Sequence, residues 1–589
     1  MADAENNGVE MNSAHIVTPV PQAAAPAAPV KKETKAQKVE RLKLEKNPWA
    51  AWEEVRQFAR EGREAVLPDW AGVYFKWWGI YTQGDGVGAV GGVGGEGKAS
   101  EYFMMRVGVP NGILTSEQTR VIADIARDHG RDLADVTTRQ NIQFHWLTIQ
   151  SLPLVVEALE RVGLSPKGAC GDVVRNVTGC PLAGRLKHEL VDASPLAARV
   201  AAHLTANPDF VNLPRKFKIM VSGCPDWCSY PEINDIGLTA IQREDGEVGY
   251  SIRVGGGLSK DPHLAIRLNA FVKQDQAEEA CYEIARIFRD QTGSLRESRT
   301  HARMKFMFMK DGWTAESFLA DLERRLGYKF DPAPEEIMPD DLYRDHMGVM
   351  PQQQEGLSSI GISVTRGRLN ATQISALAGL ADEFGSGSVR CTIQQNIMLI
   401  DIPNATVQEV VARIRALGLH VEATNFWRGT VACTGTEFCK LAITETKGFA
   451  RWLVDEMEER VPNFDQQLRI NVTGCPNNCG QAWIADIGLE GKKIKVEGQM
   501  VDAYYFCLGG ALGKHAGFAR AVGYRVPATE VPVAMERLLG TYLKQRTPEE
   551  NLRQYFARHS DEELRGQLAG AIVAPVERDL PSGRPPADM

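Results

Sequence analysis

The 589-residue sequence predicts an α+β protein built from two halves that are related by a pseudo-twofold axis. Segment 112–118 reappears in diverged form as 367–373, 255 residues further on, and 138–142 matches 393–397 at the same offset. Each copy has apolar residues at spacings of three and four, typical of a helix, and then a stretch typical of a strand. Internal repeats of this kind indicate a duplicated unit.

The elements of the two halves follow one another in the same order. The first helix of each copy is expected to end at Gly130 and Gly385, which are placed as helix C-caps. Further along, 222–228 matches 473–479, and 235–238 matches 486–489, both at an offset of 251. Glycine turns follow at 254–258 and 508–512. The matched segments 138–142 and 393–397 each contain a Gln-Asn pair, Gln140-Asn141 and Gln395-Asn396. A ligand at the junction of the halves would contact both pairs.

Length, charge and hydropathy exclude several classes of protein. A chain of this length is expected to form several domains. The net charge of -8 argues against nucleic acid as the main partner, and no apolar run approaches a membrane span. Residues 1–30 lack the pattern of a secretory signal and are expected to be a disordered tail, so the cytoplasm is the expected location. The charged run 31–46 is expected to be a solvated helix.

Four of the eleven cysteines form two close pairs, Cys433 with Cys439 and Cys475 with Cys479. In a large cytosolic chain, clustered thiols indicate metal binding or catalysis rather than disulfides. Four thiolates are the ligand set of an iron–sulfur cluster. Zinc is the alternative, but its paired ligands are usually separated by two to four residues, and the first pair here is separated by five. Four structural cysteines are the remaining reading, which the surrounding turn residues disfavour.

The first half offers an internal comparison. It keeps Cys224 and Cys228, but the segment aligned with 433–439 is 177–183, so that the two other ligand positions are Val177 and Ala183. We therefore expect one cluster, in the second half.

The paired cysteines within this repeat resemble those of the sirohaem- and [4Fe–4S]-containing nitrite and sulfite reductases of the ferredoxin-dependent type, over residues 77–540. The resemblance implies sirohaem and a [4Fe–4S] cluster as cofactors, with Cys479 also bridging to the haem iron. It implies that each half is a ferredoxin-like α/β subdomain followed by a mixed α+β sirohaem/[4Fe–4S] domain. The expected boundaries are a tail at 1–45, half-domains at 46–168 and 336–424, larger domains at 169–335 and 425–545, and a C-terminal tail at 546–589.

By the same resemblance, the substrate is a small oxyanion held by cations at Arg106, Arg175, Lys216 and Lys218. Such groups bind the anion, offset the charge of a carboxylate-rich haem and help to deliver protons. Lys216 and Lys218 share one face of an extended run, whose other face is apolar. The expected sirohaem contacts are Arg139, Asn141, Gln143, His145, Gln395, Asn396 and Cys479, although His145 is as well explained as a structural histidine.

Different sequence features favour nitrite and sulfite as the substrate. Five segments resemble nitrite reductases, namely 103–112, 116–120, 135–141, 175–179 and 431–435. Lys218, the run 143–146 and the combination of Tyr81 with Cys170 resemble the sulfite branch. Breadth of resemblance favours an assimilatory nitrite reductase, with a ferredoxin-dependent sulfite reductase as the alternative. An iron–sulfur electron-transfer protein without catalytic activity is the second alternative.

A glycine-rich stretch, 84–97, contains a formal dinucleotide fingerprint at 86–91. The fingerprint requires a helix after it, but 102–107 reads as a strand, so the stretch is interpreted as a flexible loop. Electrons are therefore expected from a separate carrier, ferredoxin, and the enzyme is expected to be a monomer.

Overall fold

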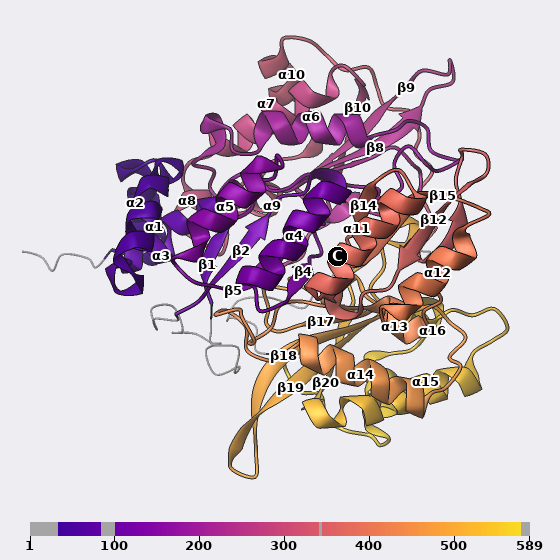
Figure 1. The fold of residues 1–589 in the computed structure, drawn as a ribbon. Coiled ribbons are helices and arrows are strands. Elements are labelled where there is room, and N and C mark those ends of the chain that lie inside the picture. The colour runs from indigo at the N-terminus through magenta and orange to yellow at the C-terminus, as the bar shows by residue number, and fades with distance from the viewer. Residues whose placement is uncertain (1–32, 84–100, 341–343, 579–589) are drawn as a thin grey trace, which may run out of the picture.

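The computed structural model describes residues 33–83, 101–340 and 344–578. Within these residues the strands form four five-stranded sheets. Two smaller sheets and their helices lie side by side across the middle of the molecule, with a larger domain on either side of them (Figure 1). The predicted α+β class and the duplication are confirmed.

The two smaller units are the ferredoxin-like half-domains. The first contains β1 (Ile80–Thr82), β2 (Phe103–Val107), α4 (Ser116–His129), β4 (Ala134–Val136), β5 (Ile142–Leu147) and α5 (Ser151–Arg161). The second repeats this order with β11 (Gly348–Pro351), β12 (Leu357–Ile362), α11 (Ala371–Phe384), β14 (Ser388–Cys391), β15 (Ile397–Pro403) and α12 (Val407–Ala416). Apolar side chains of both units belong to one continuous core, so the two fold as one body.

The half-domains exchange a strand. β3 (Ile113–Thr115) pairs with β14 of the other half, and β13 (Arg368–Leu369) pairs with β4. Gly112 and Gly367 precede these strands at φ 69° and 70°. A Cβ at Gly112 would lie 2.3 Å from the carbonyl oxygen of Cys391, and one at Gly367 would lie 2.5 Å from that of Val136. Only glycine fits both the left-handed backbone and this close approach.

The predicted helix ends are confirmed at Gly130 and Gly385, which cap α4 and α11. Neither glycine adopts a left-handed conformation, since φ is -106° and -118°. Backbone crowding explains them instead, because a Cβ at Gly130 would lie 3.0 Å from the oxygen of Ala126, and one at Gly385 would lie 2.6 Å from that of Ile400.

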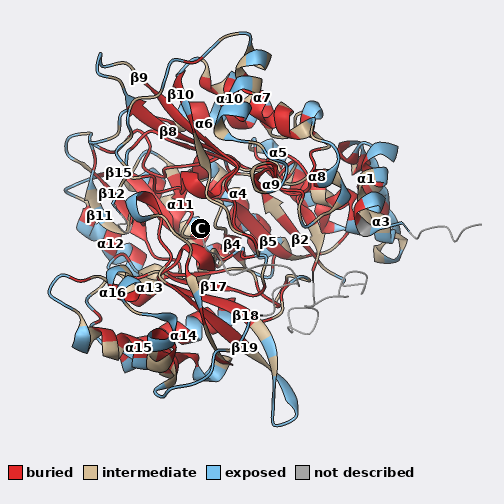
Figure 2. Cartoon of the chain, turned by 180° about the vertical axis from the view of Figure 1, so that it is seen from behind, coloured by how far each residue is buried: buried red, intermediate tan, exposed pale blue. Residues whose placement is uncertain are grey.

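The two larger domains also share a topology, in which the first three strands are parallel and the others antiparallel. The first has β6 (Thr178–Gly179), α6 (Ser194–Leu204), β7 (Ile219–Ser222), β8 (Ile236–Gln242), β9 (Val248–Val254), β10 (Ile266–Lys273), α7 (Ala277–Arg289), α8 (Ser294–Glu297), α9 (Lys305–Met309) and α10 (Ala315–Leu326). The second has α13 (Asn425–Gly429), β16 (Thr430–Ala432), α14 (Lys447–Arg460), β17 (Ile470–Thr473), β18 (Ile487–Val496), β19 (Gln499–Leu508), β20 (Arg520–Pro527) and α15 (Val531–Gln545). The tip of the β18–β19 hairpin is exposed (Figure 2).

The ends of the described chain are more ordered than the sequence suggests. In α1 (Lys35–Glu45), Leu42 and Lys43 are buried, so this helix is docked rather than solvated, and α2 (Trp52–Glu61) and α3 (Pro68–Gly72) follow it. The expected C-terminal tail is corrected, because α16 (Leu552–Arg558) and α17 (Asp561–Ala569) pack buried Tyr555, Phe556 and Leu564 into the second large domain. The predicted disordered tail at 1–30 and the glycine-rich loop 84–97 lie outside the described residues.

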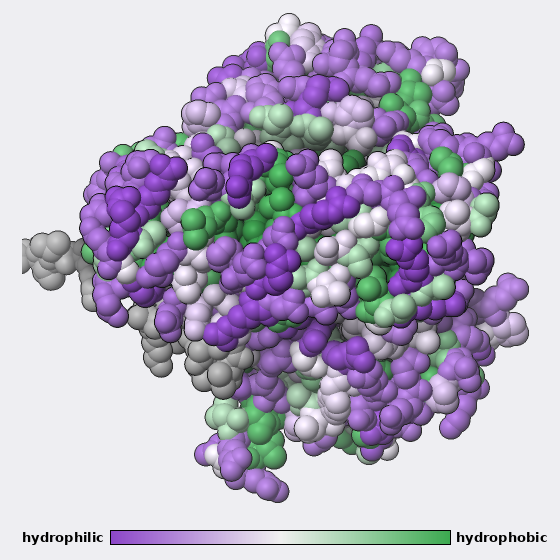
Figure 3. Space-filling model, viewed as in Figure 1, coloured by the Kyte–Doolittle hydropathy of each residue, from purple (hydrophilic) through white to green (hydrophobic). Residues whose placement is uncertain are grey.

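The surface in Figure 3 is mostly hydrophilic, with apolar residues in small separate groups. None of the described helices has the length and apolar character that a membrane span requires.

Candidate active site

The four predicted cations come from the first half and are half-buried. Arg106, on β2, donates from Nη2 to Oε1 of Gln143 at 2.9 Å and from Nη1 to Sγ of Cys170 at 3.2 Å. Lys216 and Lys218 lie in the extended run that leads into β7, and the intervening Phe217 is fully buried. The predicted alternation is therefore confirmed.

An aspartate fixes the lysine run in place. The buried Asp235 accepts from the backbone N–H of Lys218 at 2.8 Å and from Nη2 of Arg303 at 2.8 Å, both at Oδ2. Asp486, its counterpart in the second half, likewise accepts from the N–H of Arg469 at 2.7 Å. The repeated Asp-Ile-Gly-Leu motif therefore anchors the strand entrance in both halves.

The cations lie close enough to alter one another's proton affinity. Burial lowers the pKa of Lys216 to about 7, with Arg303 and Arg175 adding to the shift and Cys479 opposing it. Burial, reinforced by Lys216 and Arg139, lowers the pKa of Lys218 well below its usual value. This concentration of positive charge is unfavourable unless an anion binds to it.

Among the described residues, no carboxylate neutralises these four side chains. In the described part of the chain, none of them forms a salt bridge, and Arg175 donates instead to the carbonyl oxygens of Gly171 (2.6 Å) and Ala169 (3.2 Å). Buried charges are usually paired with opposite charge. The unpaired cations therefore indicate a site for an anionic ligand.

The four predicted cluster cysteines belong to the second large domain, and two of them, Cys439 and Cys479, lie close enough to Arg106 to affect its pKa. Cys433 follows β16, and its Sγ accepts from the N–H of Gly474 at 3.2 Å. Backbone N–H groups also reach the thiols of Cys439 and Cys475. Cys479 is exposed, and its charge affects the pKa of both Arg106 and Lys216. The donor set, four thiols with backbone N–H donors, fits a [4Fe–4S] cluster beside an anionic cofactor.

The predicted sirohaem contacts of the first half fall into two groups. Arg139 donates to Oδ1 of Asn234 at 2.8 Å and to the oxygen of Asn176 at 2.6 Å, and burial lowers its pKa to about 9. Its Nε and the Oδ1 of Asn141 are buried without a hydrogen-bond partner in the described structure. Such groups usually find a partner, so they are suited to contact a polar ligand.

Gln143 and His145 belong instead to a network under the cluster domain. Gln143 accepts from Arg106 and donates to Oγ1 of Thr434 at 3.4 Å. Nε2 of His145 lies 3.1 Å from Oδ2 of Asp135, and burial lowers the pKa of the imidazole. The alternative reading of His145, as a structural histidine, accounts for these contacts.

Gln395 and Asn396 are engaged with backbone groups. Gln395 donates to the oxygen of Val136 at 3.1 Å and accepts from the N–H of Ala432 at 3.0 Å, while Asn396 accepts from the N–H of Val364 at 2.9 Å. Gln140 forms the equivalent bonds to Cys391 and Gly179. The glutamines thus join each half-domain to the other half, and their contact with sirohaem stays a prediction.

Strand register corrects the sequence alignment of the cysteine segments. Gly179 pairs with Val221 in the first half, and Ala432 pairs with Val472, its counterpart, in the second. Cys180 therefore stands where Cys433 stands, and Val177 does not. The loops that follow have equal length, because the N–H groups of both 190 and 443 bond to the glycine before the next cysteine.

The first half thus retains three of the four cysteine positions rather than two. The position of Cys439 is taken by Leu186, so this half still lacks the fourth cysteine. The sequence-based expectation of one four-cysteine cluster, in the second half, does not depend on the corrected alignment.

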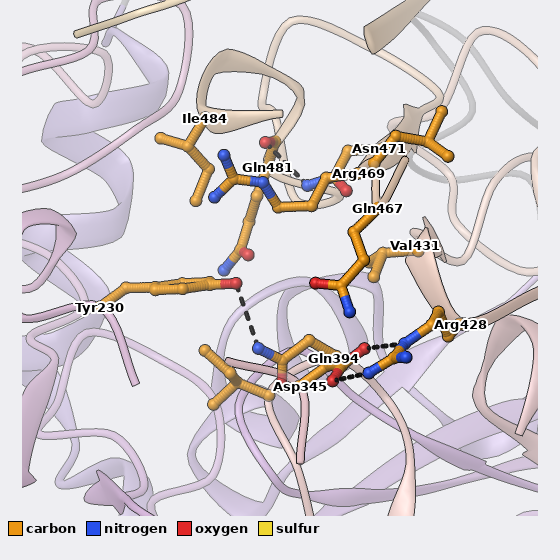
Figure 4. A pocket seen from close by; sticks show the side chains of 13 residues that line it. Tyr230, Asp345, Gln394, Arg428, Val431, Gln467, Arg469, Asn471, Gln481 and Ile484 are labelled. Atoms are coloured by element: carbon orange, nitrogen blue, oxygen red, sulfur yellow. Dashed lines mark hydrogen bonds and ion pairs between the residues drawn. The ribbon is translucent and has the colours of Figure 1, made fainter. Parts of the chain in front are cut away.

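The counterpart of the cationic site in the second half is the pocket in Figure 4. Gln467 and Gln394 stand there where the first half has Lys216 and Arg139. Its Arg428 is neutralised by Asp345, with contacts of 2.6 and 2.7 Å that Figure 4 also shows. Arg469, the counterpart of Lys218, also lines this pocket, and its Nε lies 3.5 Å from Oδ2 of Asp486, so both arginines there have a carboxylate partner.

Two further cations were missed by sequence reasoning. Arg303 and Arg215 affect the pKa of Lys216, and Arg303 also affects that of Lys218. The segment 301–306 alternates basic and apolar residues, a signal that could have pointed to Arg303.

Comparison with known proteins agrees with this geometry. The family described as "Nitrite and sulphite reductase 4Fe-4S domain" matches residues 170–330 and 423–571. The family described as "Nitrite/Sulfite reductase ferredoxin-like half domain" matches 96–162 and 350–417. The chain belongs to the nitrite and sulfite reductase family. It is an oxidoreductase, and sirohaem and a [4Fe–4S] cluster are the cofactors of this family.

Individual relatives carry both names. The chain is 39% identical to an assimilatory ferredoxin-dependent nitrite reductase of Haloferax mediterranei, over 92% of this chain and 94% of that one. It is 35% identical to sulfite reductase [ferredoxin] 2 of Mycolicibacterium paratuberculosis, over 89% and 95%. The solved structure of the Mycobacterium tuberculosis NirA protein has a TM-score of 0.86 and 34% identity, over 91% of this chain and 98% of that one.

Proposed function

We propose that this member of the nitrite and sulfite reductase family is an assimilatory ferredoxin-dependent nitrite reductase, which reduces nitrite to ammonia by six electrons. The observation that carries the proposal is the set of half-buried cations that have no carboxylate partner among the described residues and that lie near the exposed Cys479. The similarity to the Haloferax mediterranei nitrite reductase supports nitrite as the substrate.

The residues of the chain have separable roles in this proposal. The oxyanion is bound, and its negative charge stabilised, by Arg106, Arg175, Lys216 and Lys218. The attraction between one such cation and a unit negative charge 4 Å away is about 4 kcal/mol at an effective dielectric of about 20. Because the pKa of Lys216 is lowered to about 7, its ammonium can release a proton near neutral pH. When bound, the cluster and the sirohaem would transfer electrons from the external donor to the substrate.

The cluster would be held by Cys433, Cys439, Cys475 and Cys479. Of these, Cys479 would also face the haem iron. Arg139 and Asn141 would contact the haem periphery through their unpartnered polar atoms. This division of roles keeps the cluster-binding cysteines in the second half and the anion-binding cations in the first.

A ferredoxin-dependent sulfite reductase is the second candidate, and two observations favour it. Lys218 adds a cation that would favour the dianionic sulfite. The Tyr81 hydroxyl also hydrogen-bonds the Cys170 thiol, to which Arg106 donates. The sulfite reductase names of mycobacterial relatives support the same candidate.

Steady-state reduction of nitrite and sulfite by one preparation separates the candidates. A higher kcat/KM for nitrite supports the first, and a preference for sulfite would overturn it. Lys218→Asn should shift the nitrite-to-sulfite ratio of kcat/KM by about tenfold towards nitrite, which corresponds to ~1.4 kcal/mol. Lys544→Asn, on the exposed face of α15, is the control and should not alter the ratio.

Ferredoxin is the proposed electron donor, as the names of the relatives suggest. A cytoplasmic, monomeric enzyme is proposed with it. Activity with reduced ferredoxin but not with NADPH alone supports this donor.

A further inference from the structure

Three cysteines of the first large domain form a compact buried group. Within the described residues, one set of three or more Cys, His, Asp or Glu side chains has all its ligand atoms within 4.8 Å of one another, and it consists of Cys180, Cys224 and Cys228. Each is at most 2% exposed. The group lies in an apolar cluster that includes Leu182, Leu186, Met398 and Ile400. It is therefore separate from the cationic site.

The loop that carries two of these cysteines keeps the conformation of a ligand loop. Cys224-Pro-Asp-Trp-Cys228 corresponds to Cys475-Pro-Asn-Asn-Cys479 in the cluster domain. The residue before the second cysteine is left-handed in both loops, at φ 52° for Trp227 and 55° for Asn478. Asparagine adopts this conformation readily, but tryptophan does so at a cost. The N–H of Asp226 also bonds the Cys224 thiol, as backbone groups do around metal thiolates.

The spacing of the thiols fits a single metal ion. Zinc binds cysteine sulfur at about 2.3 Å, so tetrahedral ligands lie about 3.8 Å apart. The sulfurs of Cys180, Cys224 and Cys228 lie within 4.8 Å of one another, close enough to reach this spacing with small side-chain adjustments. The four cluster cysteines of the second half do not form such a group among the described residues, as expected if they bind different irons of a larger cluster.

A histidine approaches the group at Cys180, although its ring nitrogens do not lie within 4.8 Å of all three sulfurs, so its side chain has to adjust to serve as the fourth ligand. Nε2 of His346 is 3.8 Å from Sγ of Cys180, close to the ~3.6 Å expected between nitrogen and sulfur ligands of one tetrahedral zinc. His346 precedes β11, and the neighbouring Asp345 is bound by Arg428. The close approach of Gly361 to the carbonyl oxygen of His346 also fixes this segment.

The surroundings offset the charge of a thiolate site. Arg390, buried in the second half-domain, donates to the carbonyl oxygens of Pro181 (2.9 Å) and Ala183 (3.1 Å), in the loop after Cys180. The hydroxyls of Ser222 and Ser229 lie 3.6 and 3.7 Å from the thiols of Cys224 and Cys228. Three thiolates and one imidazole around Zn²⁺ carry one net negative charge, which this guanidinium can balance.

We propose that Cys180, Cys224, Cys228 and His346 bind a structural zinc ion, which ties the first large domain to the segment that leads into the second half. Soft thiolates with one imidazole, closed to solvent, are a zinc ligand set of the structural type. In this proposed site, a histidine from another segment takes the role of the fourth cysteine, whose position is occupied by Leu186. The proposal does not depend on the nitrite or sulfite assignment.

Metal analysis of the iron-replete holoenzyme tests the proposal. We expect about one zinc per chain in addition to the iron of the cofactors. Zinc X-ray absorption should show three sulfurs at about 2.3 Å and one nitrogen at about 2.0–2.1 Å. Cys180→Ser and His346→Gln should lose at least half of the zinc and retain cofactor iron and haem absorption. Cys281→Ser, another buried cysteine of the same domain, is the control that should retain zinc.

Several results would overturn the proposal. Zinc well below one per chain with three free thiols, a disulfide within the group, or iron in place of zinc would each do so. Zinc with four sulfur ligands would place the ion at the cluster cysteines instead. Equal zinc loss in Cys281→Ser would show that destabilisation, rather than ligand removal, releases the ion.

Discussion

The imidazole of His145 stacks on the ring of Phe438, with centroids 3.8 Å apart and 18° between the planes. Phe438 directly precedes Cys439, so a side chain of the first half supports a ligand loop of the second. Phe438→Ala removes this support and leaves a cavity, which costs about 3–5 kcal/mol for a buried Phe. We expect lower iron and labile sulfide per chain, measured after anaerobic purification.

Phe464→Ala is the matched control for this experiment. Phe464 is also buried in the second large domain and stacks on Phe426, away from the cysteines. Both variants should lose stability, but the control should keep its iron and sulfide. Equal cofactor loss in the two would contradict a local role for Phe438.

Gln140 and Gln395 are predicted to stabilise the junction of the halves. Each amide bonds backbone groups of both halves, and removal leaves buried groups unsatisfied at about 1–3 kcal/mol each. Gln140→Ala and Gln395→Ala should each lower the free energy of unfolding in urea by ~2–4 kcal/mol. If Gln395 also contacts sirohaem, its variant should lose haem absorption per folded chain, and the Gln140 variant should not.

Much of the fold was predictable from the sequence because the repeats preserve local chemistry. Helix ends at Gly130 and Gly385 depend on nearby carbonyls, and the alternation around Phe217 depends on strand geometry. The strand exchange was not predictable, because 113–115 pairs with a strand more than 270 residues away. Local patterns contain no information on such a partner.

The candidate site, like the fold, was only partly predictable from local sequence patterns. Alignment matched Thr178-Gly179 with Thr434-Gly435 because the residues are identical. Backbone pairing instead makes Gly179 equivalent to Ala432, which places Cys180 at a ligand position. His346 and Arg303 reach their sites from distant segments, so spacing could not identify them.

Asp172 is predicted to hold α1 on the first large domain. This residue is 2% exposed, and its carboxylate is contacted by Arg299 and Lys43. Burial alone would raise the pKa of this carboxyl, but the two cations outweigh burial and hold the pKa far below the usual range. A depressed folded pKa adds stability that is full above the unfolded value of about 3.9 and is lost below it. Asp172→Asn should therefore lower the free energy of unfolding by ~3–5 kcal/mol, and this loss should be the same at pH 7 and at pH 5.

Urea unfolding across this pH range measures the effect, and proteolysis near α1 reports its detachment. Asp69→Asn is the control, because its salt bridge with Lys38 is 45% exposed on both sides and is worth about 0–1 kcal/mol. A loss for Asp172→Asn no larger than that of the control would show that the buried network contributes little.

Lys216 is predicted to set the alkaline limit of turnover. Its pKa of about 7 in the protein alone means that the anion-binding ammonium becomes neutral as pH rises, and bound anionic cofactors would raise that value. We expect kcat/KM to fall on the alkaline side at or above pH 7. Lys216→Arg stays protonated and should move this limb to higher pH, even if the maximal rate drops. Unchanged alkaline limbs in the two proteins would assign the titration to another group.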